Sequence, residues 1–202
     1  MKDGELAFYG ARPGAPPGRW MIFVDGENLT IRAQEFAKGE GGQFFTEGPH
    51  FKQDTFFWFP GFQATANLME TVIPAQAHAT RAYYYTALVG DDARQAEVTT
   101  ALREIGFSPR VFKKLKQTQK AKGVDIMLTI DVLGHGFRDH YDSVLLVAGD
   151  GDYVPLLEEV KRLGKNAYVA FLRGNGLNES LRIAADRFFD ITNMVREAWK
   201  LK

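Results

Sequence analysis

The sequence holds four aspartates whose surroundings differ from those of ordinary surface acids. Two of them lie in Gly149-Asp150-Gly151-Asp152, directly after the apolar run Val144 to Ala148. A third follows the apolar run Trp20 to Val24, and the fourth opens a helical segment after Lys122-Gly123-Val124. Clustered carboxylates without histidine or cysteine suit Mg²⁺ or Mn²⁺, and such ions activate water in phosphodiester cleavage. The acids of this set are Asp25, Asp125, Asp150 and Asp152.

Some residues around these acids also have an ordinary structural explanation. Asp is a favoured N-cap, so Asp152 could cap the helix that follows it, where Pro155 is tolerated in the first turn. Asn28 is equally well placed to cap a helix that begins at Leu29. Asp25 lies ahead of that predicted cap, where a structural role is harder to find. The capping and the functional explanations therefore both stay open for Asp152 and Asn28.

Composition narrows the class of protein. The chain has 202 residues, 45% of them hydrophobic, which is typical of one globular domain. It has no cysteine, so disulfides and thiolate metal sites are excluded, and a reducing cytoplasmic setting, our predicted location, is compatible. No apolar run approaches the roughly 20 residues of a membrane helix, and the N-terminus does not resemble a signal peptide. The four histidines show no metal-ligand spacing.

A basic run precedes Asp125. No acid interrupts the chain between Arg110 and Asp125. A run of charges is usually a solvated surface, and the formal net charge of zero gives no support for a nucleic-acid partner. The position of the run, directly ahead of an acidic element, nevertheless favours contact with the backbone phosphates of a nucleic acid. The residues predicted to make this contact are Lys113, Lys114, Lys116, Lys120 and Lys122.

Strand-like and helix-like segments alternate along the chain. Strands are predicted at 20–24, 81–88, 107–115, 144–148, 166–172 and 188–191, and helices at 29–36, 63–71, 91–105, 122–139, from 154, 178–185 and 192–201. Such alternation predicts a three-layer α/β fold, a mostly parallel sheet with helices on both faces. Active sites of such folds lie at the carboxyl ends of the strands. The four acids converge there if the first and fourth strands are neighbours.

The predicted helix at 122–139 carries two acids. Its apolar residues occupy nearly the whole circumference, which predicts a buried helix. Buried carboxylates must be paired, hydrogen-bonded or metal-bound. Asp125 lies in the first turn, whereas Asp131 comes six residues later and points to a different side, so we assign Asp131 only a supporting role.

Two segments flank or interrupt this pattern. Residues 1–19 are predicted to form a flexible arm rich in glycine and proline. The segment 38–61 is unusually aromatic and is predicted to be an inserted loop or hairpin, packed on the core or, as a less favoured alternative, stacking on bases. Its aromatic residues are Phe44, Phe45, Phe51, Phe56, Phe57, Trp58 and Phe59.

Three motifs together carry a family resemblance. They resemble the signatures of the NYN domain, LabA-like branch, in the PIN-like nuclease superfamily. The motifs are Val24-Asp25-Gly26-Glu27-Asn28, Lys122-Gly123-Val124-Asp125 and Ala148-Gly149-Asp150-Gly151-Asp152-Tyr153. The tail from Ser180 to Phe188 is also similar to the end of this family. The resemblance covers residues 20–191, so we treat 20–202 as one domain. It implies strand order 3-2-1-4-5, ribonuclease activity and a Mg²⁺ or Mn²⁺ site. By match, the catalytic residues and metal ligands are Asp25, Asp125, Asp150 and Asp152, supported by Asn28.

Other functional classes compete with a metal-dependent ribonuclease. A non-catalytic RNA-binding module of the same fold is the first alternative, and the presence of all four acids argues against it. A Toprim-like phosphotransfer domain also has a strand that ends in Asp-x-Asp, but it needs a glutamate where this chain has Asp25. We expect an RNA partner, single-stranded or structured, and no membrane. The sequence does not decide the role of the 38–61 insert or the mode of cleavage. It also leaves the oligomeric state open, and a homo-oligomer is one of the possibilities.

Overall fold

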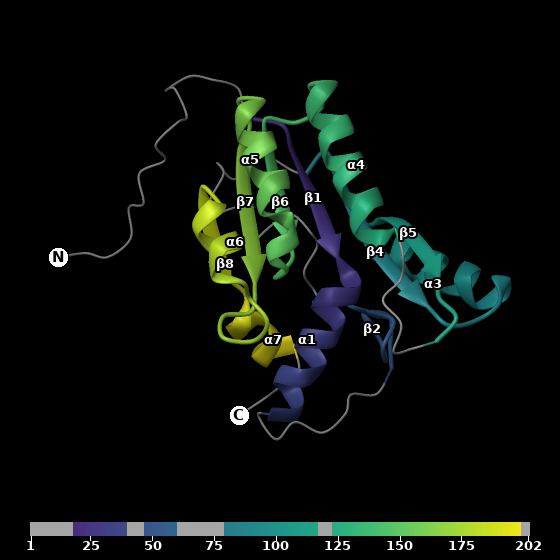
Figure 1. Cartoon of the computed structure of the whole chain (residues 1–202). Helices are drawn as coiled ribbons and strands as arrows, with labels where there is room; N and C mark the ends of the chain where they lie inside the picture. Colours follow the sequence, from purple (N-terminus) through teal and green to yellow (C-terminus); the bar gives the residue numbers. More distant parts are fainter. Residues whose placement is uncertain (1–17, 40–46, 60–78, 117–122, 199–202) are drawn as a thin grey trace.

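The computed structural model describes residues 18–39, 47–59, 79–116 and 123–198. Its centre is a sheet of six parallel strands in the order β5-β4-β1-β6-β7-β8 (Figure 1). The strands are β1 (Trp20–Asp25), β4 (Arg81–Leu88), β5 (Ser108–Lys113), β6 (Ser143–Val147), β7 (Asn166–Phe171) and β8 (Arg187–Asp190). Counted along the chain, this order is 3-2-1-4-5 with a sixth strand added at one edge. The predicted α/β fold and strand order are therefore confirmed.

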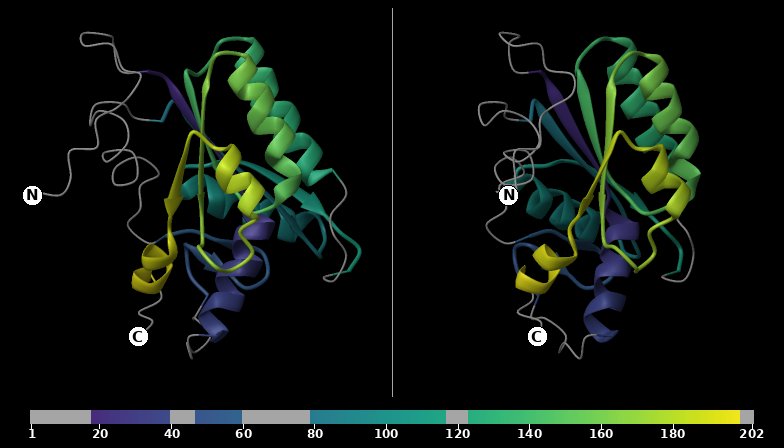
Figure 2. Two further views of the ribbon diagram at one scale, coloured as in Figure 1. Left: turned by 60° about the vertical axis from the view of Figure 1, so that its left-hand side comes forward. Right: turned by 90° about the vertical axis from the view of Figure 1, so that its left-hand side faces the viewer.

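Helices cover both faces of this sheet, which makes the fold three-layered (Figure 2). One face packs against α1 (Gly26–Gly39), α3 (Asp92–Glu104) and α7 (Thr192–Ala198). The opposite face packs against α4 (Val124–Phe137), α5 (Val154–Arg162) and α6 (Glu179–Ala184). Alternate residues of β1 serve the two cores, Ile22 the first and Phe23 the second, as the twofold repeat of a strand requires. None of the helices in the described ranges has the length and apolar character needed to cross a membrane.

The register of the central strands brings the acidic segments together. β1 pairs with β6 in parallel, with Val24 opposite Val147. Asp25 and the segment that begins at Ala148 therefore leave the sheet at the same edge, its carboxyl edge. The convergence of the acids was predicted on the condition that the first and fourth strands are neighbours. The pairing of β1 with β6 meets that condition.

The described part of the aromatic insert belongs to the core. A short hairpin, β2 (Phe51–Lys52) and β3 (Phe56–Phe57), leads into Trp58 and Phe59, and all four aromatic residues from 56 to 59 are buried. The Tyr84 hydroxyl accepts a hydrogen bond from the backbone N–H of Phe57 and donates one to its carbonyl. These rings fill the layer beside α1 and are not presented to a ligand, so the core-packing explanation holds for them. Phe44 and Phe45 lie outside the described residues.

Helix α4 corrects one prediction. It was expected to be buried all round, but Ile126, Ile130 and Phe137 are 65%, 56% and 65% exposed. The side that packs on the sheet carries Val124, Leu128, Val132 and Gly136, spaced four residues apart. A helix in the outer layer of a three-layer fold has neighbours on one side only, and the apolar residues of its other side stay in solvent.

Three further predictions fall on residues that the structure does not describe. The predicted arm lies outside the described residues except for positions 18 and 19, and the predicted helix at 63–71 lies wholly outside them. Lys120 and Lys122 also lie outside them.

Candidate active site

Asp25 ends β1 and is 4% exposed. Helix α1 begins at the next residue, and the Asp25 Oδ1 atom accepts a hydrogen bond from the Asn28 backbone N–H at 3.0 Å. This is the bond that an N-cap side chain makes, so Asp25 has the structural role that the sequence did not predict for it. Glycine is required at position 26, because a Cβ atom there would lie 1.9 Å from the Tyr84 ring.

Asn28 lies inside the first turn of α1 and does not cap it. Its side-chain oxygen accepts a hydrogen bond from the Gly149 backbone N–H at 3.0 Å. The capping explanation for Asn28 was therefore wrong. Its amide ties the start of α1 to the loop after β6, and so holds the segment that carries Asp25 beside the segment that carries Asp150 and Asp152.

Tyr153 joins two of the predicted acids directly. Its hydroxyl lies 3.0 Å from Asp25 Oδ2 and 3.1 Å from Asp125 Oδ1, so the two carboxylates share one hydrogen-bond donor. From the sequence, Tyr153 was part of a motif but was assigned no role. Its place directly after the Gly-Asp-Gly-Asp segment was the sequence signal that pointed to it. The contacts of its hydroxyl could not be predicted, because they depend on how the ring packs.

The surroundings of Asp25 disfavour a negative charge on its carboxyl. Burial and the nearby carboxylates of Asp125 and Glu27 outweigh the hydrogen bonds from the Asn28 N–H and the Tyr153 hydroxyl, and together these effects raise the pKa of Asp25 to about 7. A buried carboxylate that titrates near neutrality is characteristic of sites that bind a cation or transfer a proton.

Asp150 precedes a single turn of 3-10 helix, η1 (Gly151–Tyr153), and Asp152 lies within that turn. The Asp150 carboxylate caps this turn by accepting from the Asp152 backbone N–H at 3.1 Å. Asp152 is exposed, and α5 begins after Tyr153 without a side-chain cap, so the capping explanation for Asp152 does not hold. The short turn delivers the Tyr153 ring to the Asp25–Asp125 pair while both acidic side chains stay at the carboxyl edge.

The donor set is suited to a hard cation. In the described ranges, no three His, Cys, Asp or Glu side chains are grouped closely enough to hold one ion. Asp25 and Asp125 form a pair, however, and Mg²⁺ is commonly held by one or two carboxylates together with water and substrate phosphate oxygens. All the side-chain atoms of this pair that could bind a cation are oxygens, the ligand type that Mg²⁺ and Mn²⁺ prefer. The two residues therefore fit such an ion.

Asp131 lies apart from the pair. Its carboxylate accepts from the Tyr85 hydroxyl at 2.7 Å and forms an ion pair with Arg110 at 3.3 Å. These contacts attach α4 to β4 and β5. The structure therefore gives Asp131 a role in packing instead of the supporting role in the site that was predicted.

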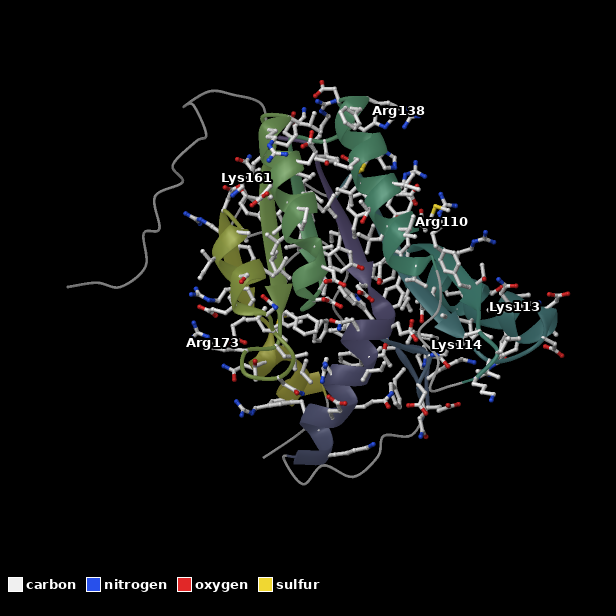
Figure 3. The ribbon with its side chains drawn as sticks, in the orientation of Figure 1. Arg110, Lys113, Lys114, Arg138, Lys161 and Arg173 are labelled. Carbon is white, nitrogen blue, oxygen red and sulfur yellow. The ribbon has the colours of Figure 1, made fainter. Side chains whose placement is uncertain are left out.

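The predicted basic run divides into residues with different surroundings. Lys113 forms an ion pair with the exposed Asp92, and Lys116 is exposed. The side chain of Lys114 is only 2% exposed, and its ammonium lies 2.6 Å from Glu27, so it is not presented to a phosphate. Figure 3 shows Lys114 beside the start of α1, whereas Lys113 lies farther out, toward α3. The prediction that Lys114 contacts RNA is thus replaced by a contact within the protein.

Comparisons with known proteins bear on the family and the fold of this chain. The model of the NYN domain family matches residues 19–192. The chain is 27% identical to the low amplitude and bright protein LabA of Synechococcus elongatus over 188 residues, 88% of this chain and 86% of that protein. The crystal structure of a protein of unknown function from Vibrio parahaemolyticus aligns with a TM-score of 0.58 at 21% identity, covering 88% of this chain and 95% of that one, and so supports the fold.

Proposed function

Because the chain belongs to the NYN domain family, within the PIN-like nucleases, we propose that it is a Mg²⁺- or Mn²⁺-dependent ribonuclease. The observation that carries the proposal is the convergence of Asp25 and Asp125 on one hydroxyl at the carboxyl edge of the sheet. A buried acid beside a second, half-buried acid is costly to a protein that binds nothing there. The supporting observation is that Asp150 and Asp152 leave the neighbouring strand at the same edge.

The proposed reaction is hydrolysis of an RNA phosphodiester bond by water. Asp25 and Asp125 would hold the cation, which when bound polarises a phosphate oxygen and lowers the pKa of water. Asp150 and Asp152 are assigned to the same catalytic set, where carboxylate oxygens orient water by accepting its hydrogens. Asn28 has a positioning role: its side-chain oxygen accepts a hydrogen bond from the Gly149 backbone N–H and so holds the two acidic segments beside each other.

The first prediction tests the reaction itself. Wild-type protein should cleave single-stranded or hairpin RNA with Mg²⁺ or Mn²⁺ and should not cleave either with excess chelator. Zn²⁺ should not replace these ions, because the site has no sulfur or histidine ligand. Denaturing gels of end-labelled RNA provide the measurement. Cleavage that survives full chelation would overturn the metal dependence, and Mn²⁺ binding without cleavage of either RNA would favour the non-catalytic RNA-binding module.

The second prediction concerns RNA binding by the remainder of the basic run. Simultaneous replacement of Lys116, Lys120 and Lys122 by Ala should weaken RNA binding regardless of sequence. Each lost phosphate contact should reduce the slope of log affinity against log salt by about 0.7 on single strands, so the slope should fall by about 2. Filter binding at several salt concentrations measures it.

A matched variant separates phosphate contact from net charge. Arg94, Arg162 and Arg182 are cations on helix surfaces that pair with a glutamate three residues away, and replacing them by Ala removes the same charge. The salt slope should then stay close to the wild-type value. Equal slopes in the lysine variant and the wild type would return the run to an ordinary solvated surface.

A further inference from the structure

Tyr153 has an unusual position for a tyrosine hydroxyl. Its hydroxyl oxygen lies 3.0 Å from Asp25 Oδ2 and 3.1 Å from Asp125 Oδ1, so its one hydrogen is within reach of both carboxylates. The other oxygen of Asp25 already accepts from the Asn28 N–H. Both Asp25 oxygens are therefore engaged by donors from the protein, and one of these donors also serves the second acid.

The fold leaves this hydroxyl little freedom to move. The ring of Tyr153 is 2% exposed and packs in the core under α4 and α5. The turn that carries it is capped by Asp150, and a Cβ atom on Gly151 would lie 2.5 Å from the Asn178 side chain. Asn178 is itself bonded to the Gly149 carbonyl through its backbone N–H at 2.8 Å. The hydroxyl is thus held between the carboxylates by contacts on several sides.

We infer that Tyr153 is a positioning residue that sets the affinity of the site for its cation, an inference that rests on the metal dependence proposed above. Without a cation, the hydroxyl holds Asp25 and Asp125 toward one point and offsets part of their repulsion. A cation at that point needs the same two oxygens, so it competes with the hydroxyl for them. The hydroxyl therefore stabilises the cation-free protein and weakens cation binding.

Tyr153→Phe tests this inference because it removes the hydroxyl and keeps the ring. The variant should melt at a lower temperature than wild type in chelator, since a buried carboxylate loses a donor. It should nevertheless bind Mn²⁺ with a Kd about tenfold lower, since a hydrogen bond to a charged group no longer competes. Isothermal titration with Mn²⁺ at pH 8.0, where protons compete little for Asp25, gives the Kd without any assay of activity.

Tyr141→Phe is the matched control. Tyr141 is fully buried, and its hydroxyl donates to the Val132 carbonyl at 3.1 Å, within the same layer but away from the two acids. This variant should also melt lower, with an unchanged Kd for Mn²⁺. A merely structural role for Tyr153 would give the same result in both variants.

The outcomes separate this inference from the proposed function. A Kd in Tyr153→Phe equal to or higher than the wild-type value would overturn the role of Tyr153 and leave the metal-dependent ribonuclease in place. Absence of Mn²⁺ binding in every protein would overturn both. If Tyr153→Phe does not fold, the ultraviolet absorbance of the wild-type protein tests the inference instead. Mg²⁺ should shift the tyrosine absorbance to shorter wavelength, because the Tyr153 hydroxyl loses its carboxylate partners. The same shift should occur in Tyr141→Phe, and an unchanged spectrum at saturating Mg²⁺ would overturn the inference.

Discussion

Asp25→Asn is expected to raise the melting temperature of the metal-free protein at pH 8 and to abolish RNA cleavage. The amide keeps the Oδ1 that accepts from the Asn28 N–H, and its Nδ2 can donate to the Tyr153 hydroxyl, which still donates to Asp125. The substitution removes one of two like charges in a buried site. Relief of that repulsion is worth on the order of 1 kcal/mol or more, or about 2–4 °C in a chain of this size.

The pH dependence of this gain follows from the pKa of Asp25. Burial raises that pKa from 3.8 in the unfolded chain to about 7 in the fold, so the folded state binds the proton more tightly. The protonated carboxyl therefore favours folding fully below pH 3.8, and that contribution is lost as the pH rises through 7. The asparagine variant has no such loss. Its advantage in melting temperature should grow between pH 4 and 7 and stay constant above.

Thermal melts in chelator and in Mn²⁺, with one cleavage gel, measure these effects. Wild type should gain stability from Mn²⁺, and Asp25→Asn should lose most of that gain. Asp152→Asn removes the same charge from an exposed position and should hardly change the melting temperature in chelator. A variant at Asp25 that melts lower than wild type in chelator, yet still gains stability from Mn²⁺, would remove Asp25 from the site and the ribonuclease proposal with it.

Much of the scaffold was predictable because local patterns encode it. The apolar run of β1 ends one residue before the strand does, and the apolar run of β6 ends one residue after its strand. Neighbouring parallel strands then bring Asp25 and the Gly-Asp-Gly-Asp segment to one edge without further information. The role of Tyr153 was not predictable in this way. Its hydroxyl meets Asp25 across 128 positions of the chain, and only the packing of η1 under α4 decides where it points.

Helix α4 shows the limit of reading burial from periodicity. Its two apolar arcs look alike in sequence, and the arc of Ile126, Ile130 and Phe137 is no less hydrophobic than the one that packs on the sheet. The difference is steric. A Cβ atom on Gly136 would lie 2.8 Å from the Tyr141 hydroxyl, so the small residue marks the side of close approach.

Two lysines of the basic run differ in their surroundings because side chains alternate between the two faces of a strand. Lys113 ends β5 and Lys114 follows it, so their side chains point to opposite faces. One reaches solvent near Asp92 and the other enters the protein beside Glu27. Counting charges along the sequence treats both lysines alike, whereas the alternation of a strand separates them.

Lys114→Ala is expected to destabilise the protein strongly, in contrast to Lys113→Ala. The ammonium of Lys114 and the carboxylate of Glu27 are 2.6 Å apart, with side chains 2% and 16% exposed. Removing one partner leaves a largely buried charge uncompensated, which costs about 3 kcal/mol and about 6–12 °C in melting temperature. The partner of Lys113 is Asp92, 93% exposed, and an ion pair in solvent contributes less than about 1 kcal/mol.

A double variant distinguishes loss of the charge pair from loss of packing. Lys114→Met combined with Glu27→Gln removes both charges and keeps both side-chain volumes, so it should recover most of the stability that Lys114→Ala loses. Chemical denaturation of the three variants and the wild type gives the free energies of unfolding. A Lys114→Ala variant as stable as Lys113→Ala would mean that the ammonium is not held by Glu27, and Lys114 would then be available to bind an RNA phosphate as its neighbours in the run are proposed to do.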